Sequence, residues 1–174
     1  MNKYMKLFDN NQTDTKEIPE IELYMDQVIT ILEKILVNYK TDNENKIMTK
    51  TMINNYVKAN IIDKPNKKKY GKDQIMELIM IYHYKNILSF NDIEILLKSC
   101  KKYFEESTQL TYENFTNIRK EVLDQTKLEV DKIDIEKDYG LMKQILKHIL
   151  IADINKRIAE TLIKEIDEQN SKTD

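Results

Sequence analysis

Residues 48–71 read MTKTMINNYVKANIIDKPNKKKYG, and the character of this stretch changes halfway along. In its first half, apolar residues recur at the spacing of one face of an α-helix, which predicts an amphipathic helix over residues 50–60. Thr49 stands where its hydroxyl can accept a hydrogen bond from a free N–H group of the first turn. The face predicted to be buried consists of Met52, Ile53, Tyr56, Val57 and Ala59.

The opposite face of this helix is polar and carries side chains suited to nucleic acid. Lysine and threonine bind phosphate oxygens, and asparagine matches the hydrogen-bonding edge of adenine in the major groove. We therefore predict that this face contacts DNA. Its five residues are Lys50, Thr51, Asn54, Asn55 and Lys58.

The second half of the stretch, residues 63–71, is called the basic segment below and is predicted to form a turn and a short β-hairpin. Pro65 removes a backbone N–H donor and keeps Lys64 out of helical geometry. A helix with a polar face followed by a basic hairpin is the layout of a winged helix-turn-helix DNA-binding unit. The residues predicted to hold DNA from this wing are Lys64, Lys67, Lys68, Lys69 and Tyr70.

This layout resembles the start of MerR-type regulators, on the residues Thr51 to Tyr56, Ile61-Ile62, Pro65 and Tyr70. In that family a recognition helix is followed by a hydrophobic step, a proline and a wing that closes on a tyrosine. The likeness continues through a helix at residues 72–86. It implies a MerR-like winged fold and a DNA-binding transcriptional regulator. One departure is the polar loop Lys40–Lys46, where MerR proteins join their first two helices by a tight turn.

Over residues 18–100 the sequence is more similar still to an uncharacterised bacterial family called domain of unknown function 1836. The similarity lies in three segments: Leu23–Gln27, Thr49–Lys58 and Lys64–Tyr70. That family carries no established activity, so this resemblance implies membership of a family and no function.

Composition indicates a mainly helical protein. The chain has 174 residues with only two glycines and two prolines, whereas all-β folds need many turns. We predict an all-α (mainly) fold, with a small β-hairpin wing and a C-terminal helical region. The predicted divisions are a flexible N-terminal tail (1–17), a winged helix-turn-helix domain (18–107) and a C-terminal helical region (108–174).

Charge is unevenly distributed along the chain. The net charge is −2, yet residues 46–72 contain eight lysines and a single acid, Asp63, a local charge of +7. A basic patch on an acidic body favours a molecule that presents one face to phosphates. The alternative is a solvated lysine loop with no ligand.

The residues that enzymes use are scarce in this sequence. Two glycines exclude a glycine-rich phosphate loop, and one cysteine with two histidines gives little basis for a thiol or metal site. His83 and His148 are interpreted as ordinary helix residues, and so is Cys100, for which a redox-sensing thiol is the alternative. We therefore predict no enzymatic activity, no cofactor and no metal. A single cysteine and the absence of a hydrophobic N-terminal segment favour a cytoplasmic protein with no membrane partner.

The last predicted helix, residues 141–166, has an apolar face too wide for one neighbouring helix, which predicts packing into a bundle or a homodimer. By analogy, MerR-type regulators dimerise through a C-terminal helix. The function predicted first is sequence-specific DNA binding, with an effector left open. The alternative is a non-enzymatic protein-interaction module, a winged-helix scaffold that does not bind DNA and docks an acidic partner.

Overall fold

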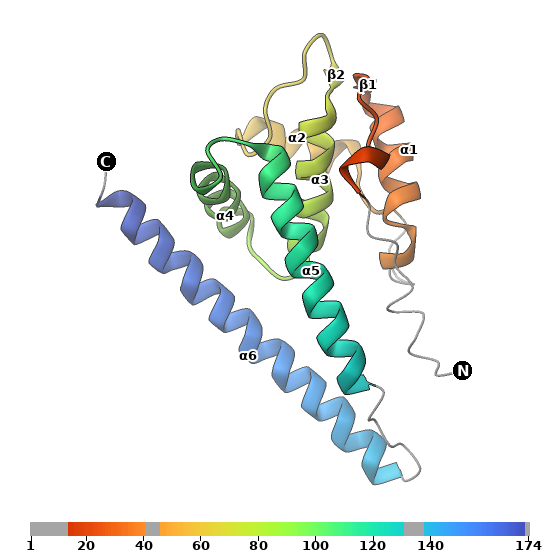
Figure 1. Cartoon of the computed structure of the whole chain (residues 1–174), viewed down its shortest axis with the longest axis vertical. Helices are drawn as coiled ribbons and strands as arrows, with labels where there is room; N and C mark the ends of the chain where they lie inside the picture. Colours follow the sequence, from red (N-terminus) through yellow and green to blue (C-terminus); the bar gives the residue numbers. More distant parts are fainter. Residues whose placement is uncertain (1–13, 41–45, 131–137, 173–174) are drawn as a thin grey trace.

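The computed structural model describes residues 14–40, 46–130 and 138–172, in which six α-helices surround a core beside one two-stranded antiparallel sheet (Figure 1). The prediction of a mainly helical fold is confirmed. The elements in chain order are η2 (Thr15–Glu17), β1 (Leu23–Tyr24), α1 (Met25–Ile35), η3 (Val37–Tyr39), α2 (Lys50–Lys58), β2 (Lys69–Tyr70), α3 (Lys72–Tyr84), α4 (Phe90–Tyr103), α5 (Thr108–Val130) and α6 (Asp138–Ser171).

Three helices begin at capping residues: Thr49, as predicted above, and Ser89 and Gly71, which the sequence follows three positions later with Asp92 and Gln74. The Thr49 hydroxyl accepts a hydrogen bond from the Met52 N–H at 3.2 Å, which starts α2. The Ser89 hydroxyl accepts a hydrogen bond from the Asp92 N–H at 3.2 Å, at the start of α4. The Gly71 N–H donates to the Gln74 side chain at 2.6 Å at the start of α3. Each bond satisfies a donor or acceptor that a helix end would otherwise leave free.

Helix α3 forms the centre of the core. Every residue from Ile75 to Tyr82 is buried, because α3 lies among α1, α2, α4 and α5 (Figure 1). A helical segment that is buried on all sides must be apolar on all sides, and residues 75–82 of α3 meet this requirement with one exception, Glu77. The neighbouring helices contribute Val28, Leu32, Ile53, Tyr56, Ile93, Leu97 and Tyr112 to the same cluster.

Glu77 forms an ion pair with Lys101 of α4. Its side chain is 2% exposed, and its Oε2 atom has no hydrogen-bond partner among the described residues. Burial raises the pKa of the Glu77 carboxyl to about 7, although the Lys101 ammonium pulls in the opposite direction. The desolvation cost of the charged form exceeds the gain from the ion pair.

We expect Glu77→Gln to flatten the pH dependence of stability. A carboxyl whose pKa is higher in the folded state binds a proton more readily there than in the unfolded chain, so stability falls as pH rises from about 4.5 to about 7. Over this pH range the free energy of unfolding of the parent falls by about 3 kcal/mol, and the variant lacks this fall. Urea unfolding at about pH 5 and about pH 7.5 measures the difference. The matched control is Glu129→Gln, at an exposed position of α5. A parent with the same stability at both pH values would contradict this account.

The N-terminal region differs from the prediction. The sequence Ile18-Pro19-Glu20 predicts a helix start, because proline is tolerated in the first turn, but α1 begins only at Met25. The segment before it contains β1, in which Leu23 lies opposite Tyr70 of β2. Ile18 and Leu23 are both buried, because the segment before α1 lies against the core without forming a helix. Residues 15–17 of the predicted tail form η2, which contacts α5. Residues 1–13 lie outside the described residues, so the tail stays a prediction there.

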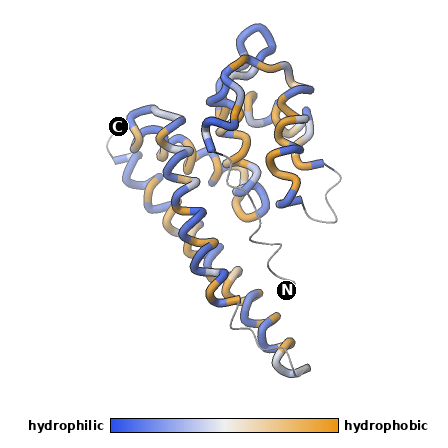
Figure 2. The backbone as a smooth tube through the Cα atoms, turned by 45° about the vertical axis from the view of Figure 1, so that its right-hand side comes forward, coloured by the Kyte–Doolittle hydropathy of each residue, from blue (hydrophilic) through white to orange (hydrophobic). Residues whose placement is uncertain are grey.

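Helices α5 and α6 extend away from the core. The predicted domain boundary after residue 107 falls at the start of α5, yet Tyr112 of this helix is buried in the same core as α3. The far half of α5 leaves the core, and α6 returns to contact α4 near its own C-terminal end (Figures 1 and 2). Among the described residues, no helix has an apolar stretch long enough to cross a lipid bilayer.

Candidate nucleic-acid interface

Helix α2 presents its polar face to solvent, as the helical spacing predicts. Ile53 and Tyr56 are buried on the inner face, which fixes the rotation of the helix about its axis. The structure brings all five side chains of the predicted DNA-contacting face together on the exposed side. These are Lys50, Thr51, Asn54, Asn55 and Lys58.

The C-terminal end of α2 is held in place by specific contacts. The Tyr56 ring stacks on Phe90 at the start of α4, with centroids 5.0 Å apart and planes 13° from parallel. After the helix, Asn60 adopts a left-handed conformation with φ of 57°, and the Ile61 N–H donates to the Tyr56 carbonyl at 3.0 Å. Ile62 is then fully buried. The chain therefore leaves α2 in one defined direction, towards the basic segment.

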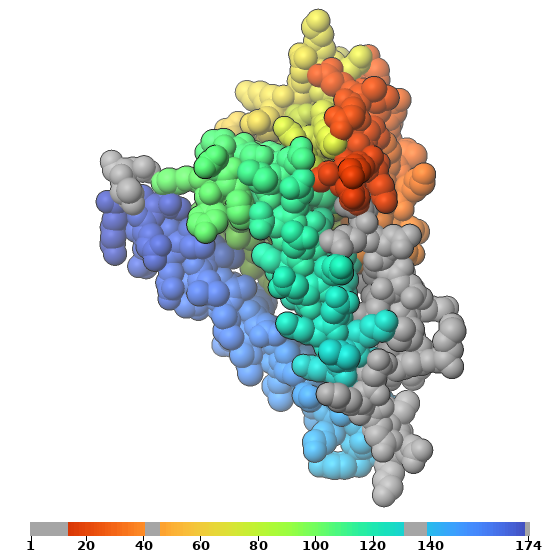
Figure 3. Space-filling model, viewed as in Figure 1, coloured from red at the N-terminus to blue at the C-terminus, as the bar shows by residue number. Residues whose placement is uncertain are grey.

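The basic segment contains a tight reversal with lysines at its tip. The Lys69 N–H donates to the Asn66 carbonyl at 2.8 Å, and both intervening residues have positive φ, 47° at Lys67 and 67° at Lys68. This is the geometry of a type I′ turn, where glycine and asparagine are usual because a Cβ is strained there. The turn is placed where the sequence predicts it, and it projects from the molecule as a knob (Figure 3, yellow).

The structure at the base of this turn differs from two of the predictions. The two-stranded sheet does not lie wholly within the basic segment, because β2 pairs with β1 from before α1. Tyr70 is 2% exposed, and this burial raises the pKa of its phenol. Tyr70 is thus a core residue rather than a DNA contact. Lys69 is half-buried, with its Nζ atom 5.2 Å from the centroid of the Tyr24 ring.

Six of the eight lysines of the patch fall into two groups by their partners. Lys50 forms an ion pair with Asp26 of α1, with 2.6 Å between Nζ and Oδ1, and Lys72 forms an ion pair with Glu20. Acids from α1 and from the residues before it therefore border the patch, a feature that local sequence patterns do not indicate. The second group has no ion-pair partner among the described residues and is exposed to solvent. It consists of Lys58, Lys64, Lys67 and Lys68.

The remaining titratable groups do not form a reactive cluster. Burial and the nearby Arg119 lower the pKa of His83 to about 4, which leaves it neutral, and its ring packs 4.9 Å from that of Tyr39. Burial raises the pKa of the Cys100 thiol, which disfavours the thiolate that redox sensing requires. Among the described residues, no three His, Cys, Asp or Glu side chains are grouped so that they could hold a metal ion.

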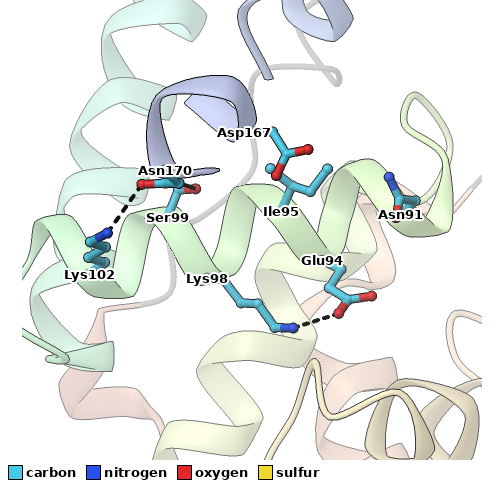
Figure 4. Close-up of a pocket in the computed structure, with 8 residues that line it drawn as sticks. All are labelled: Asn91, Glu94, Ile95, Lys98, Ser99, Lys102, Asp167 and Asn170. Atoms are coloured by element: carbon cyan, nitrogen blue, oxygen red, sulfur yellow. Dashed lines mark hydrogen bonds and ion pairs between the residues drawn. The ribbon is translucent and has the colours of Figure 1, made fainter. Parts of the chain in front are cut away.

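A pocket lies between α4 and the C-terminal end of α6 (Figure 4). One wall carries an ion pair between Lys98 and Glu94 at 2.6 Å, and on the other side Asn170 accepts a hydrogen bond from Lys102 at 3.4 Å. Its polar groups are thus partly satisfied by one another. We assign no ligand to it.

These features define a small, mainly helical protein that exposes one polar helix face and one lysine-rich turn. A family model described as "Domain of unknown function (DUF1836)" matches residues 13–118, and the chain belongs to this family. The predicted family is confirmed. The match ends within α5, so the far half of α5 and all of α6 lie outside it. Comparisons with curated proteins and with solved structures gave no match.

Proposed function

We propose that the protein is a sequence-specific DNA-binding protein, a cytoplasmic transcriptional regulator whose residues 18–107 form a MerR-like winged helix-turn-helix domain. The polar face of α2 enters the major groove, and the reversal at Lys67 and Lys68 acts as the wing. One observation carries this proposal: the exposed polar face of α2 is followed directly by exposed lysines that have no ion-pair partner among the described residues. Unpaired lysines are available to replace the counterions of DNA phosphates.

The conformation of the turn supports the same role. Lysine is a costly choice at two adjacent positions with positive φ, and glycine or asparagine would relieve the strain. Holding lysines there places two charges at the tip of a rigid, projecting turn. A wing that reaches the DNA backbone needs charges at that position.

In this proposal some residues of α2 recognise base edges and others bind the phosphate backbone. Asn54 and Asn55 offer the amide groups that bind adenine N6 and N7 through two hydrogen bonds. Thr51 and Lys58 suit phosphate oxygens. On binding DNA, Lys50 gives up its ion pair with Asp26 and contacts a phosphate instead. The free energy lost with that ion pair is small, because exposed ion pairs contribute at most about 1 kcal/mol.

The second candidate is a protein-interaction module that does not bind DNA. The observation that favours it is the acidic border of the patch, where Glu20 and Asp26 pair with lysines and weaken the positive field. A mobility-shift titration with fragmented genomic DNA at increasing salt separates the two. DNA binding predicts a shifted band that weakens steeply with salt, whereas the interaction module predicts no shift at any salt concentration.

We expect Asn54→Ala to reduce sequence discrimination while leaving the fold intact, because this side chain is exposed in the middle of the polar face. Loss of a bidentate base contact costs roughly 1–3 kcal/mol on the preferred site and little on random DNA. Fluorescence anisotropy with the preferred site and with random DNA measures the ratio of the two affinities. Asn117→Ala, exposed on α5, is the matched control. An equal loss of affinity on both DNA types would contradict the reading role.

A further inference from the structure

Helix α6 contacts the core on one side only. Near its C-terminal end Ile163 is 5% exposed, and the Asn170 side chain donates to the Ser99 hydroxyl of α4 at 3.1 Å. The side opposite Ile163 carries a row of large aliphatic residues exposed to solvent. We call this row the α6 stripe; it consists of Leu150, Ile151, Ile154, Ile158 and Leu162, which are 38–60% exposed.

The α6 stripe has the spacing of a helix-pairing surface. Its residues recur every three or four positions, which on a helix of 3.6 residues per turn places them on one side. Ile154, Ile158 and Leu162 outline a shallow apolar groove on this side. No element among the described residues covers it, and contiguous apolar surface of this kind marks an interaction site on a protein that is otherwise highly charged.

The charges along α6 indicate what covers the stripe. In the middle of the helix, charges pair within the helix itself, Arg157 with Asp153 at 3.0 Å and Lys156 with Glu160 at 3.8 Å. The charges in line with the two ends of the stripe have no ion-pair partner among the described residues. They are Lys143 and Lys147 before the stripe, and Glu165 and Glu168 after it.

We propose that two copies of this chain pair through their α6 stripes in antiparallel orientation, about a twofold axis near residue 156. In this arrangement Ile154 faces the partner's Ile158, and Leu150 faces the partner's Leu162. Lys147 then meets the partner's Glu165, because the positions related by the axis are equally far from it. The basic end of each stripe thus meets the acidic end of the other. This gives the predicted homodimer a defined interface.

A second copy fits better than an unrelated partner because the pattern is complementary to itself. A twofold interface uses the same surface on both subunits, and each stripe supplies both the apolar centre and the two opposite charges. The paired segment from residue 147 to residue 165 is about 27 Å long, enough for several turns of interlocked side chains. The stripe lies outside the family match, so this pairing stands independently of DNA binding by α2.

Sedimentation velocity of the full chain at micromolar concentration tests the pairing. The parent is expected to sediment as a dimer and Ile154→Glu as a monomer, because the twofold axis brings two buried carboxylates into one interface. Circular dichroism shows whether helix content is retained, as expected for a substitution at an exposed position. Ile149→Glu is the matched control, since Ile149 is 59% exposed on the other side of α6. This control is expected to remain a dimer. A monomeric parent would overturn the proposal and leave the stripe to a different protein.

Charge exchange tests the antiparallel orientation. Lys147→Glu alone and Glu165→Lys alone each place like charges together across the axis, and each is expected to weaken dimerisation roughly tenfold. The double variant Lys147→Glu/Glu165→Lys restores both attractive pairs and should dimerise like the parent. In a parallel pair each position faces its own copy, so neither single variant would weaken association. That result, or a double variant as weak as the singles, would overturn the antiparallel arrangement.

Discussion

Replacing Tyr56 with alanine is expected to lower the free energy of unfolding by about 3–5 kcal/mol. Tyr56 is 6% exposed, and its ring stacks on Phe90, so truncation leaves a cavity and removes the contact between α2 and α4. A loss of this size is a large fraction of the stability of a small domain. Urea denaturation followed by circular dichroism measures it from the shift in midpoint.

Tyr103→Ala is the matched control for this prediction. Tyr103 is 80% exposed at the end of α4, so the same truncation there should change the unfolding free energy by less than about 1 kcal/mol. Similar losses at the two positions would show that Tyr56 does not anchor α2.

The triple variant Lys64→Ala, Lys67→Ala and Lys68→Ala is expected to weaken DNA binding on the order of 100-fold at physiological salt. Each lysine that neutralises a phosphate releases counterions, so the slope of log affinity against log salt should fall by about 0.9 per residue. All three side chains are exposed, and we expect the fold to be unchanged. Fluorescence anisotropy over a range of salt concentrations measures both quantities.

The control for this variant removes the same charge elsewhere. Lys34, Lys120 and Lys164 are exposed on α1, α5 and α6, outside the proposed interface, and replacing all three with alanine should leave the salt slope unchanged. If both triple variants weakened binding equally, net charge rather than the lysine-rich turn would explain the affinity.

Features set by short-range contacts could be predicted from the sequence. The helix starts at Thr49, Gly71 and Ser89 depend on hydrogen bonds between residues three apart, which a reader of the sequence can recognise. The exposed and buried faces of α2 follow from helical spacing within one segment. The tight turn at Lys67 and Lys68 was placed by the proline before it and by the absence of apolar residues.

Features set by contacts between distant segments could not be predicted. Tyr70 is buried because β2 pairs with Leu23, far earlier in the chain, and nothing near Tyr70 indicates that partner. The same pairing explains why a strand, and not the predicted helix, precedes α1. Glu77 appears as a solvated acid in a helical pattern, and its burial depends on α4 covering that side of α3. The acids that border the basic patch come together with it only in the folded chain.

The most direct test of DNA recognition is selection of bound sequences from a random DNA pool by the full chain. Our account predicts that successive rounds enrich a short recurring motif, because Asn54 and Asn55 on the exposed face of α2 discriminate between base edges. It also predicts that Asn54→Ala, taken through the same selection, enriches a motif that is less restricted at one position. A folded parent that retains no DNA, or enriches no motif over the starting pool, would contradict the proposed function.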